Sequence, residues 1–198
     1  MVSVGWVDGD VWGAQNDEFF AQYNAGTLDL PAYIEFATSA WRSRPLAEAL
    51  AMRERFIAEV MQPVLQPQAM ALVERHRAAG DLMALVTATN VFVTEPIAQA
   101  FGIEHLIAVN LQRDTDGRYD GRIEGVPSFR EGKIARVENW LQGLGAQWCE
   151  FDRVTFYSDS TNDLPLLERV SHPVATNPSP ALAKIANERG WPQLQLFA

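Results

Sequence analysis

Three short polar segments of the sequence hold side chains that could act on a phosphate group: residues 85–90 (LVTATN), 129–133 (FREGK) and 156–163 (FYSDSTND). Together they offer a hydroxyl, an ammonium and two carboxylates. A hydroxyl and an ammonium can bind phosphoryl oxygens, and two carboxylates that flank three short polar residues suit a hard divalent cation with oxygen ligands. If these groups converge, they suit phosphoryl transfer.

Each segment taken alone also has a plain structural explanation. Thr87, at the end of an apolar run, could form a turn, and the Asp, Ser and Asn residues of the third segment could cap a helix. Lys133 is more informative, because the chain has only two lysines, Lys133 and Lys184, and its other basic residues are arginines. A lysine beside Gly132 favours a site that needs a compact ammonium, although a surface charge on a helix would look the same.

The elements that would position these segments alternate between strand-like and helical patterns. Apolar runs typical of strands occupy residues 82–86, 106–111, 154–157, 174–176 and 194–197. This alternation predicts a parallel sheet, in which the carboxyl ends of the strands meet at one edge and form the ligand site. Residues 88–90 are expected to form a polar loop at that edge, before a helix that Thr94 and Pro96 open.

The N-terminal part of the chain is expected to be helical, with Trp12, Asn16, Phe19 and Tyr23 on one stripe. A turn signal at residues 114–117 predicts a β-hairpin before residues 119–126. We therefore expect an α/β protein, a three-layer Rossmann-like parallel sheet with an N-terminal helical cap and a small β-hairpin insertion. The cap is assigned to residues 1–78 and the α/β core to residues 79–198.

Composition excludes several other classes of protein. The 198 residues carry a net charge of −9 with a pI near 4.8, which disfavours binding to nucleic acid or to an anionic membrane. No apolar run approaches the length of a membrane span. The single cysteine, Cys149, is expected to be a small buried or half-buried apolar residue, and a reducing cytoplasm is the expected environment. His76, His105 and His172 lack the spacing of a metal site and are expected to be structural or surface residues. The oligomeric state is not indicated.

The ordered set TATN, FREGK and YSDSTND resembles motifs II, III and IV of the haloacid-dehalogenase-like superfamily, in its subfamily IB, the phosphoserine-phosphatase-like branch. The segment at residues 25–33 also looks like the helical cap of that branch. The resemblance implies a Mg²⁺-dependent phosphatase that works through an aspartyl-phosphate intermediate.

The resemblance also implies roles for individual residues. Thr87 would donate to the phosphoryl oxygens, and Lys133 would neutralise them. Asp159 would bind Mg²⁺, while Asn162 would orient the metal's waters and Asp163 the lysine. The resemblance also implies that the helical cap covers the site and selects the leaving group. The residues implied to reach the substrate are Asn90, Arg130 and the aromatic residues of the cap.

The first motif of the superfamily, a strand that ends in D-x-D, has one formal counterpart here, Val7–Trp12 with Asp8 and Asp10. It would require residues 2–7 to form a strand, which Gly5 weakens, and Trp12 stands where the motif has a small residue. We therefore expect Asp8 and Asp10 to lie in the cap near a helix N-terminus. On this reading the nucleophile lies upstream of the printed sequence, the chain as printed is inactive, and the strand at the centre of the sheet is missing.

Two functions follow from these observations. The first is a cytoplasmic, Mg²⁺-dependent phosphomonoester hydrolase acting on a small phosphorylated metabolite, such as an amino-acid or amino-alcohol phosphate. The alternative is a catalytically inactive protein that binds phosphate or a metabolite with Thr87, Lys133 and Asp159.

Overall fold

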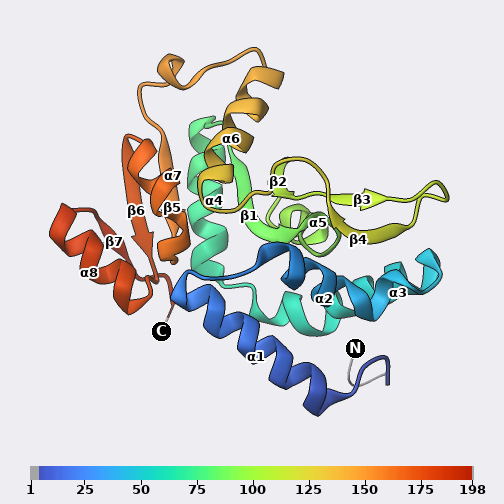
Figure 1. Cartoon of the computed structure of the whole chain (residues 1–198). Helices are drawn as coiled ribbons and strands as arrows, with labels where there is room; N and C mark the ends of the chain where they lie inside the picture. Colours follow the sequence, from blue (N-terminus) through green and yellow to red (C-terminus); the bar gives the residue numbers. More distant parts are fainter. Residues whose placement is uncertain (1–4, 198) are drawn as a thin grey trace.

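A computed structural model describes residues 5–197 and shows a mixed α/β fold, in which the N-terminal helices lie below the strands in the view of Figure 1. The helices are α1 (Gly9–Ala25), α2 (Leu30–Arg42), α3 (Leu46–Phe56), α4 (Pro67–Ala79), α5 (Val91–Ala100), α6 (Glu131–Gly143), α7 (Leu164–Arg169) and α8 (Pro180–Arg189). The strands are β1 (Ala84–Asn90), β2 (His105–Val109), β3 (Leu111–Arg113), β4 (Tyr119–Ile123), β5 (Thr155–Ser158), β6 (His172–Thr176) and β7 (Gln193–Leu194).

The parallel strands form two separate ladders. Strand β1 pairs with β2, and β5 pairs with β6, which in turn pairs with β7, all in parallel. Within residues 5–197, no ladder joins β1 to β5. Both strands nevertheless pack on one core, because Val86 of β1 and Phe156 of β5 contact the same buried cluster. The two sheets therefore share a core, although within residues 5–197 they are not joined into one hydrogen-bonded sheet.

Helices α6 and α7 supply most of the core that these two sheets share. The cluster consists of buried side chains from β2, α6, α7 and the turn after α7: Ile107, Val137, Leu141, Leu166 and Val170. A second cluster joins α7 and β6 to α8. Helix α6 thus buries residues that recur along one face, whereas β2 buries the consecutive residues Ile107, Ala108 and Val109, as expected of a strand in a parallel sheet.

The hairpin of β3 and β4 confirms the predicted insertion and packs against the N-terminal helices. Its turn is held by the Asp114 carboxylate, which accepts the backbone N–H groups of Asp116 and Arg118 at 2.9 Å each. Trp41 of α2 lies edge-on to Tyr119 of β4, with ring centroids 5.4 Å apart. The hairpin is therefore part of the contact between the helical N-terminal region and the sheets.

Helix α1 begins at the predicted place. Its N-cap is Asp8, whose carboxylate accepts the backbone N–H groups of Asp10 and Val11 at 3.0 Å each. Of the strand that a D-x-D motif would need over residues 2–7, residues 2–4 lie outside the described part of the chain, and residues 5–7 are a turn and bends. The expected cap boundary at residue 78 falls within α4 and remains a prediction.

Two local predictions were wrong. Residues 88–90 were expected to be a loop, but β1 runs to Asn90 with a register irregularity after Val86. The next helix begins at Val91, not at Thr94, because the Asn90 side chain caps it by accepting the backbone N–H of Val93 at 3.3 Å. Pro96 then lies inside α5, where it cannot donate to the carbonyl four residues earlier. That carbonyl, of Phe92, instead accepts a hydrogen bond of 3.1 Å from Arg53.

Two further strand boundaries also differ. The apolar run 106–111 divides between β2 and β3, and the last strand covers two residues, Gln193–Leu194, of which only Leu194 falls in the predicted 194–197. None of the helices in residues 5–197 is both long and apolar enough to cross a lipid bilayer.

Candidate active site

A cavity of about 370 Å³ lies between the sheets and the N-terminal helices. Its floor comes from the ends of β1 and β5 and from α6 and the turn before α7: Val86, Thr87, Ala88, Thr89, Lys133, Tyr157, Ser158, Asp159 and Asp163. Its roof comes from α1, α2 and the link between them: Asn16, Phe19, Phe20, Tyr23, Leu28, Leu30 and Tyr33. The cavity therefore gathers residues from all three polar segments of the sequence.

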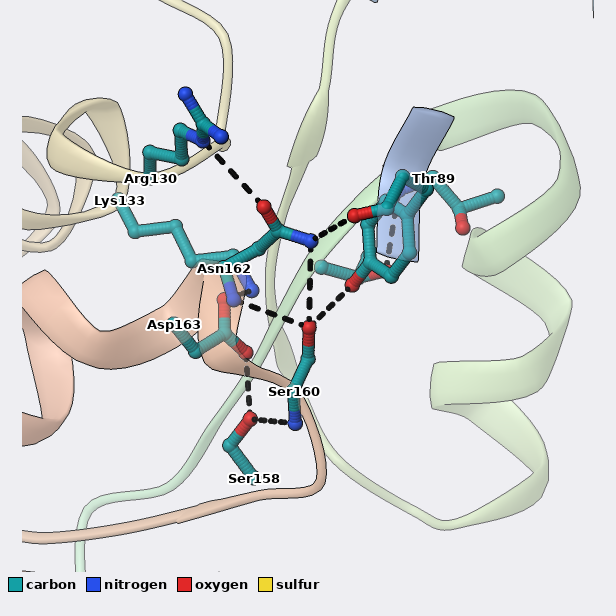
Figure 2. Close-up of polar contacts among 9 residues, drawn as sticks. Thr89, Arg130, Lys133, Ser158, Ser160, Asn162 and Asp163 are labelled. Atoms are coloured by element: carbon teal, nitrogen blue, oxygen red, sulfur yellow. Dashed lines mark hydrogen bonds and ion pairs between the residues drawn. The ribbon is translucent and has the colours of Figure 1, made fainter. Parts of the chain in front are cut away.

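The floor contains a buried ion pair between Lys133 and Asp163 (Figure 2). The Lys133 ammonium lies 2.6 Å from a carboxylate oxygen of Asp163, and the two residues are only 4% and 8% exposed. The second oxygen of Asp163 accepts the hydroxyl of Ser158 at 2.7 Å. Both carboxylate oxygens are thus engaged, so that Asp163 holds the lysine in place and is not available as a ligand in this arrangement.

The Thr87 hydroxyl lies within β1, directly after the regular pairing with β2 stops at Val86, and not at the end of the strand as predicted. Its oxygen accepts the backbone N–H of Thr89 at 3.1 Å, which satisfies the acceptor and orients the side chain. The hydroxyl hydrogen can then donate to a ligand in the cavity. Because Thr87 and Lys133 both line the cavity, they present two donors to the same space.

Asp159 is an exposed carboxylate on the cavity wall and is the candidate ligand for a divalent cation. An accessible carboxylate at a polar strand end suits Mg²⁺, which prefers oxygen ligands and retains several waters. Within residues 5–197, no group of three or more His, Cys, Asp and Glu side chains could hold a metal ion. Asp159 therefore fits as one member of a metal site that needs other oxygen ligands.

Asn162 and Arg130 connect the core to the end of α1. The Asn162 side-chain N–H donates to the carbonyl oxygen of Tyr23 at 2.9 Å, and its amide oxygen lies 3.4 Å from the Arg130 guanidinium. Arg130 also donates to the carbonyl oxygen of Gly26, just beyond α1. The Tyr23 hydroxyl completes the contact by donating to Ser160 at 2.9 Å. Burial raises the pKa of Tyr23 above its ordinary value, which keeps this hydroxyl protonated.

Asn90 and Arg130, both predicted to bind substrate, are not among the residues that line this cavity. Asn90 is buried and caps α5, whereas Arg130 links the core to α1. Asn162, which was expected to orient metal-bound water, donates to the carbonyl oxygen of Tyr23 in α1. Their predicted roles toward substrate and metal remain predictions.

The lack of a side chain at Gly132 allows the backbone to place Lys133 in the floor of the cavity. A Cβ atom at this position would lie 2.2 Å from the carbonyl oxygen of Pro127, a distance that no side chain tolerates. The turn at residues 127–132 can therefore bring Lys133 into the floor only with glycine at position 132. The FREGK pattern reflects this steric requirement as well as the charge.

Ser158 and Ser160 contribute to the site although no role was predicted for them. Both lie within the third polar segment, so their position after β5 was a usable signal. Among the histidines, His76 contacts both Asp81 at 2.7 Å and the hydroxyl of Tyr157 at 2.9 Å. It thus joins α4 to β5, which is a structural role of the kind expected. The prediction for Cys149 was wrong, because this residue is exposed and not buried or half-buried.

The fold and this arrangement of side chains define a class of protein. Residues 7–168 match the haloacid dehalogenase-like hydrolase family, and the chain belongs to that family. A curated relative, a histidinol-phosphatase from Neisseria meningitidis, is 39% identical over 194 residues, covering 98% of this chain and 87% of the relative.

Solved structures agree with this assignment. A protein of unknown function from Bordetella pertussis is 50% identical and superposes with a TM-score of 0.87, covering 93% of this chain and 82% of the other. A phosphoserine phosphatase studied as a phospho-aspartyl intermediate analogue has a TM-score of 0.65 at 15% identity, covering 93% of this chain and 80% of the other. The last comparison shows the fold alone.

Proposed function

We propose that this protein is a Mg²⁺-dependent phosphatase that hydrolyses the phosphomonoester of a small amino alcohol. The observation that carries the proposal is the convergence of Thr87, Lys133, Asp159 and Asp163 on one cavity, although they come from distant parts of the sequence. The similarity to a histidinol-phosphatase supports an amino-alcohol phosphate, and histidinol phosphate is the first compound to test.

The residues of the floor divide the work on the phosphoryl group. The Thr87 hydroxyl donates a hydrogen bond to a phosphoryl oxygen, and the Lys133 ammonium offsets the negative charge. Because Lys133 is buried and paired, Asp163 and Ser158 hold its ammonium in a fixed position, which is how a preorganised site stabilises developing charge. Asp159 would hold Mg²⁺, which supplies further positive charge beside the phosphoryl oxygens when bound.

The attacking carboxylate comes, in this proposal, from outside residues 5–197 and reaches the floor on an extended segment between β1 and β5. The separation of β1 and β5 supports this, because within residues 5–197 they share a core without being joined in one ladder, and buried backbone groups require partners. Neither Asp163 nor Asp8 is the nucleophile in this proposal. Asp163 is engaged with Lys133 and Ser158, and Asp8 caps α1 outside the cavity. A phosphoserine phosphatase of the same fold has been studied as a phospho-aspartyl intermediate analogue, which supports a carboxylate as the nucleophile.

Hydrolysis of histidinol phosphate by the native protein, followed as release of inorganic phosphate with Mg²⁺, tests the activity. Substitution Lys133→Met should abolish turnover. Substitution Lys184→Met is the matched control, because Lys184 is the other lysine of the chain and lies exposed on α8, with its side chain 78% accessible. Binding of inorganic phosphate without turnover of any phosphomonoester would favour the alternative, an inactive phosphate-binding protein.

The origin of the nucleophile requires a second experiment. Borohydride reduction of the native protein during turnover converts an aspartyl phosphate to homoserine, and mass spectrometry then locates the modified residue. We expect the modification outside residues 5–197. Modification of Asp8 or Asp10 would show that the segment at residues 7–12 supplies the nucleophile after a rearrangement of α1. Modification of Asp159 would contradict its assignment to the metal.

A further inference from the structure

The roof of the cavity differs chemically from its floor. Four of its side chains are aromatic, Phe19 and Phe20 and Tyr23 of α1 and Tyr33 of α2, and we refer to these four as the aromatic roof. Phe19 packs edge-on against Tyr33, with ring centroids 5.6 Å apart, so that these two rings support one another. Helix α1 contributes one further residue to the cavity lining, Asn16, whose side chain is an uncharged amide.

The charges around the cavity are also unevenly distributed. Lys133 is the one basic side chain among the residues that line it, and it already pairs with Asp163 in the floor. Asp159 and Asp163 are the acidic side chains of the lining, so that the cavity carries a net negative charge. No lining residue of the described chain offers a positive charge to the part of a substrate that lies under the roof.

This distribution selects between two kinds of phosphomonoester. An amino-acid phosphate carries a carboxylate on its leaving group, and burying a carboxylate without a cationic partner is unfavourable. An ammonium or a protonated imidazole is instead attracted to the faces of aromatic rings, and a flat ring can stack on them. Burial raises the pKa of both Tyr23 and Tyr33, so that the roof itself remains neutral at ordinary pH.

We infer that the aromatic roof determines specificity, by accepting a leaving group that bears a flat ring or a cation and rejecting one that bears a carboxylate. Phe20 is central to this assignment, because it lines the cavity and yet 62% of its surface is exposed. A large apolar side chain held at the mouth of a cavity gains by covering part of a ligand. The inference rests on the proposed phosphatase activity and adds the residues that read the leaving group.

Three phosphomonoesters separate the contributions of a ring, an ammonium and a carboxylate on the leaving group. Histidinol phosphate carries an ammonium and an imidazole, phosphoethanolamine carries an ammonium alone, and phosphoserine carries an ammonium with a carboxylate. With the native protein and Mg²⁺ we expect kcat/KM to fall in that order. Equal kcat/KM for phosphoserine and histidinol phosphate would overturn the inference.

Substitution Phe20→Ala tests the roof directly, and because the side chain is largely exposed, folding should be preserved. We expect kcat/KM for histidinol phosphate to fall about threefold to thirtyfold, the range of a cation–aromatic contact, and that for phosphoserine, which has an ammonium but no ring to stack, to fall less. Inhibition by inorganic phosphate, which needs only the floor, should be unchanged. The matched control is Phe56→Ala on α3, a phenylalanine 37% exposed and outside the cavity lining. An equal loss for both substrates would contradict a role in selection.

Substitution Asn16→Arg provides the opposite test by adding the missing cation. It should raise kcat/KM for phosphoserine and lower it for histidinol phosphate, and a change in the same direction for both would overturn the inference. If no phosphomonoester is hydrolysed, the proposed activity fails, and calorimetric Kd values for the same phosphates then decide the inference. Tighter binding of histidinol phosphate than of phosphoserine, weakened by Phe20→Ala, would sustain it, whereas equal binding would refute it.

Discussion

Removal of the Asp163 carboxylate should destabilise the fold more than most single substitutions. In Asp163→Ala the Lys133 ammonium, only 4% exposed, loses its partner at 2.6 Å, and the Ser158 hydroxyl loses its acceptor at 2.7 Å. Breaking a buried pair by deleting one partner costs about 3–5 kcal/mol. A domain of this size loses about 2–4 °C in Tm for each kcal/mol, so the expected drop is roughly 6–20 °C by thermal unfolding.

Two controls isolate the pair in that experiment. The exposed pair Lys184 with Glu188, at 3.9 Å, should contribute less than about 0.5 kcal/mol, so Lys184→Met should leave Tm nearly unchanged. The double variant Lys133→Met with Asp163→Leu replaces the pair by apolar groups and should recover most of the stability but none of the activity. A loss below about 1 kcal/mol in Asp163→Ala, or a double variant no more stable than the single one, would refute the buried-pair reasoning.

Three further predictions concern the site and its supports. Gly132→Ala should destabilise the protein by about 1–3 kcal/mol and impair turnover, because its Cβ meets the Pro127 carbonyl at 2.2 Å, whereas Gly143→Ala in the same helix, with open space around it, should be neutral or stabilising in urea unfolding. Asp159→Asn should remove Mg²⁺ binding measured by calorimetry, while Thr87→Ala should retain it and lower kcat by about 10²–10³-fold; loss of metal binding in both would contradict the separate roles. Burial raises the pKa of Tyr33 above 10.0, so the stability that its neutral phenol contributes is present below pH 10.0 and lost as the pH rises through the folded-state pKa. Tyr33→Phe should therefore lose less stability than the native protein between about pH 8 and about pH 11 in urea unfolding, and identical pH profiles would show that this phenol does not contribute.

The sequence by itself identified four of the polar residues that line the floor: Thr87, Lys133, Asp159 and Asp163. Thr87 and Asp159 follow apolar runs, and in alternating β and α segments the ends of parallel strands meet at one edge, so their approach follows from chain order alone. The rarity of lysine identified Lys133, and the turn signal at residues 114–117 identified the hairpin. These features depend on local patterns and on a rule of topology, and both can be read without coordinates.

Only the tertiary structure decided how the floor and roof are joined. Arg130 reaches Gly26, 104 residues away, and Asn162 reaches Tyr23, 139 residues away, through side chains to which the family resemblance gives roles toward substrate and metal. Such contacts depend on how α1 packs over the sheets, which no periodicity encodes. The same reason explains the start of α5, where Arg53 on a distant helix satisfies the carbonyl that Pro96 leaves without a partner. Local patterns determine which groups are available, and packing between distant segments determines which of them meet.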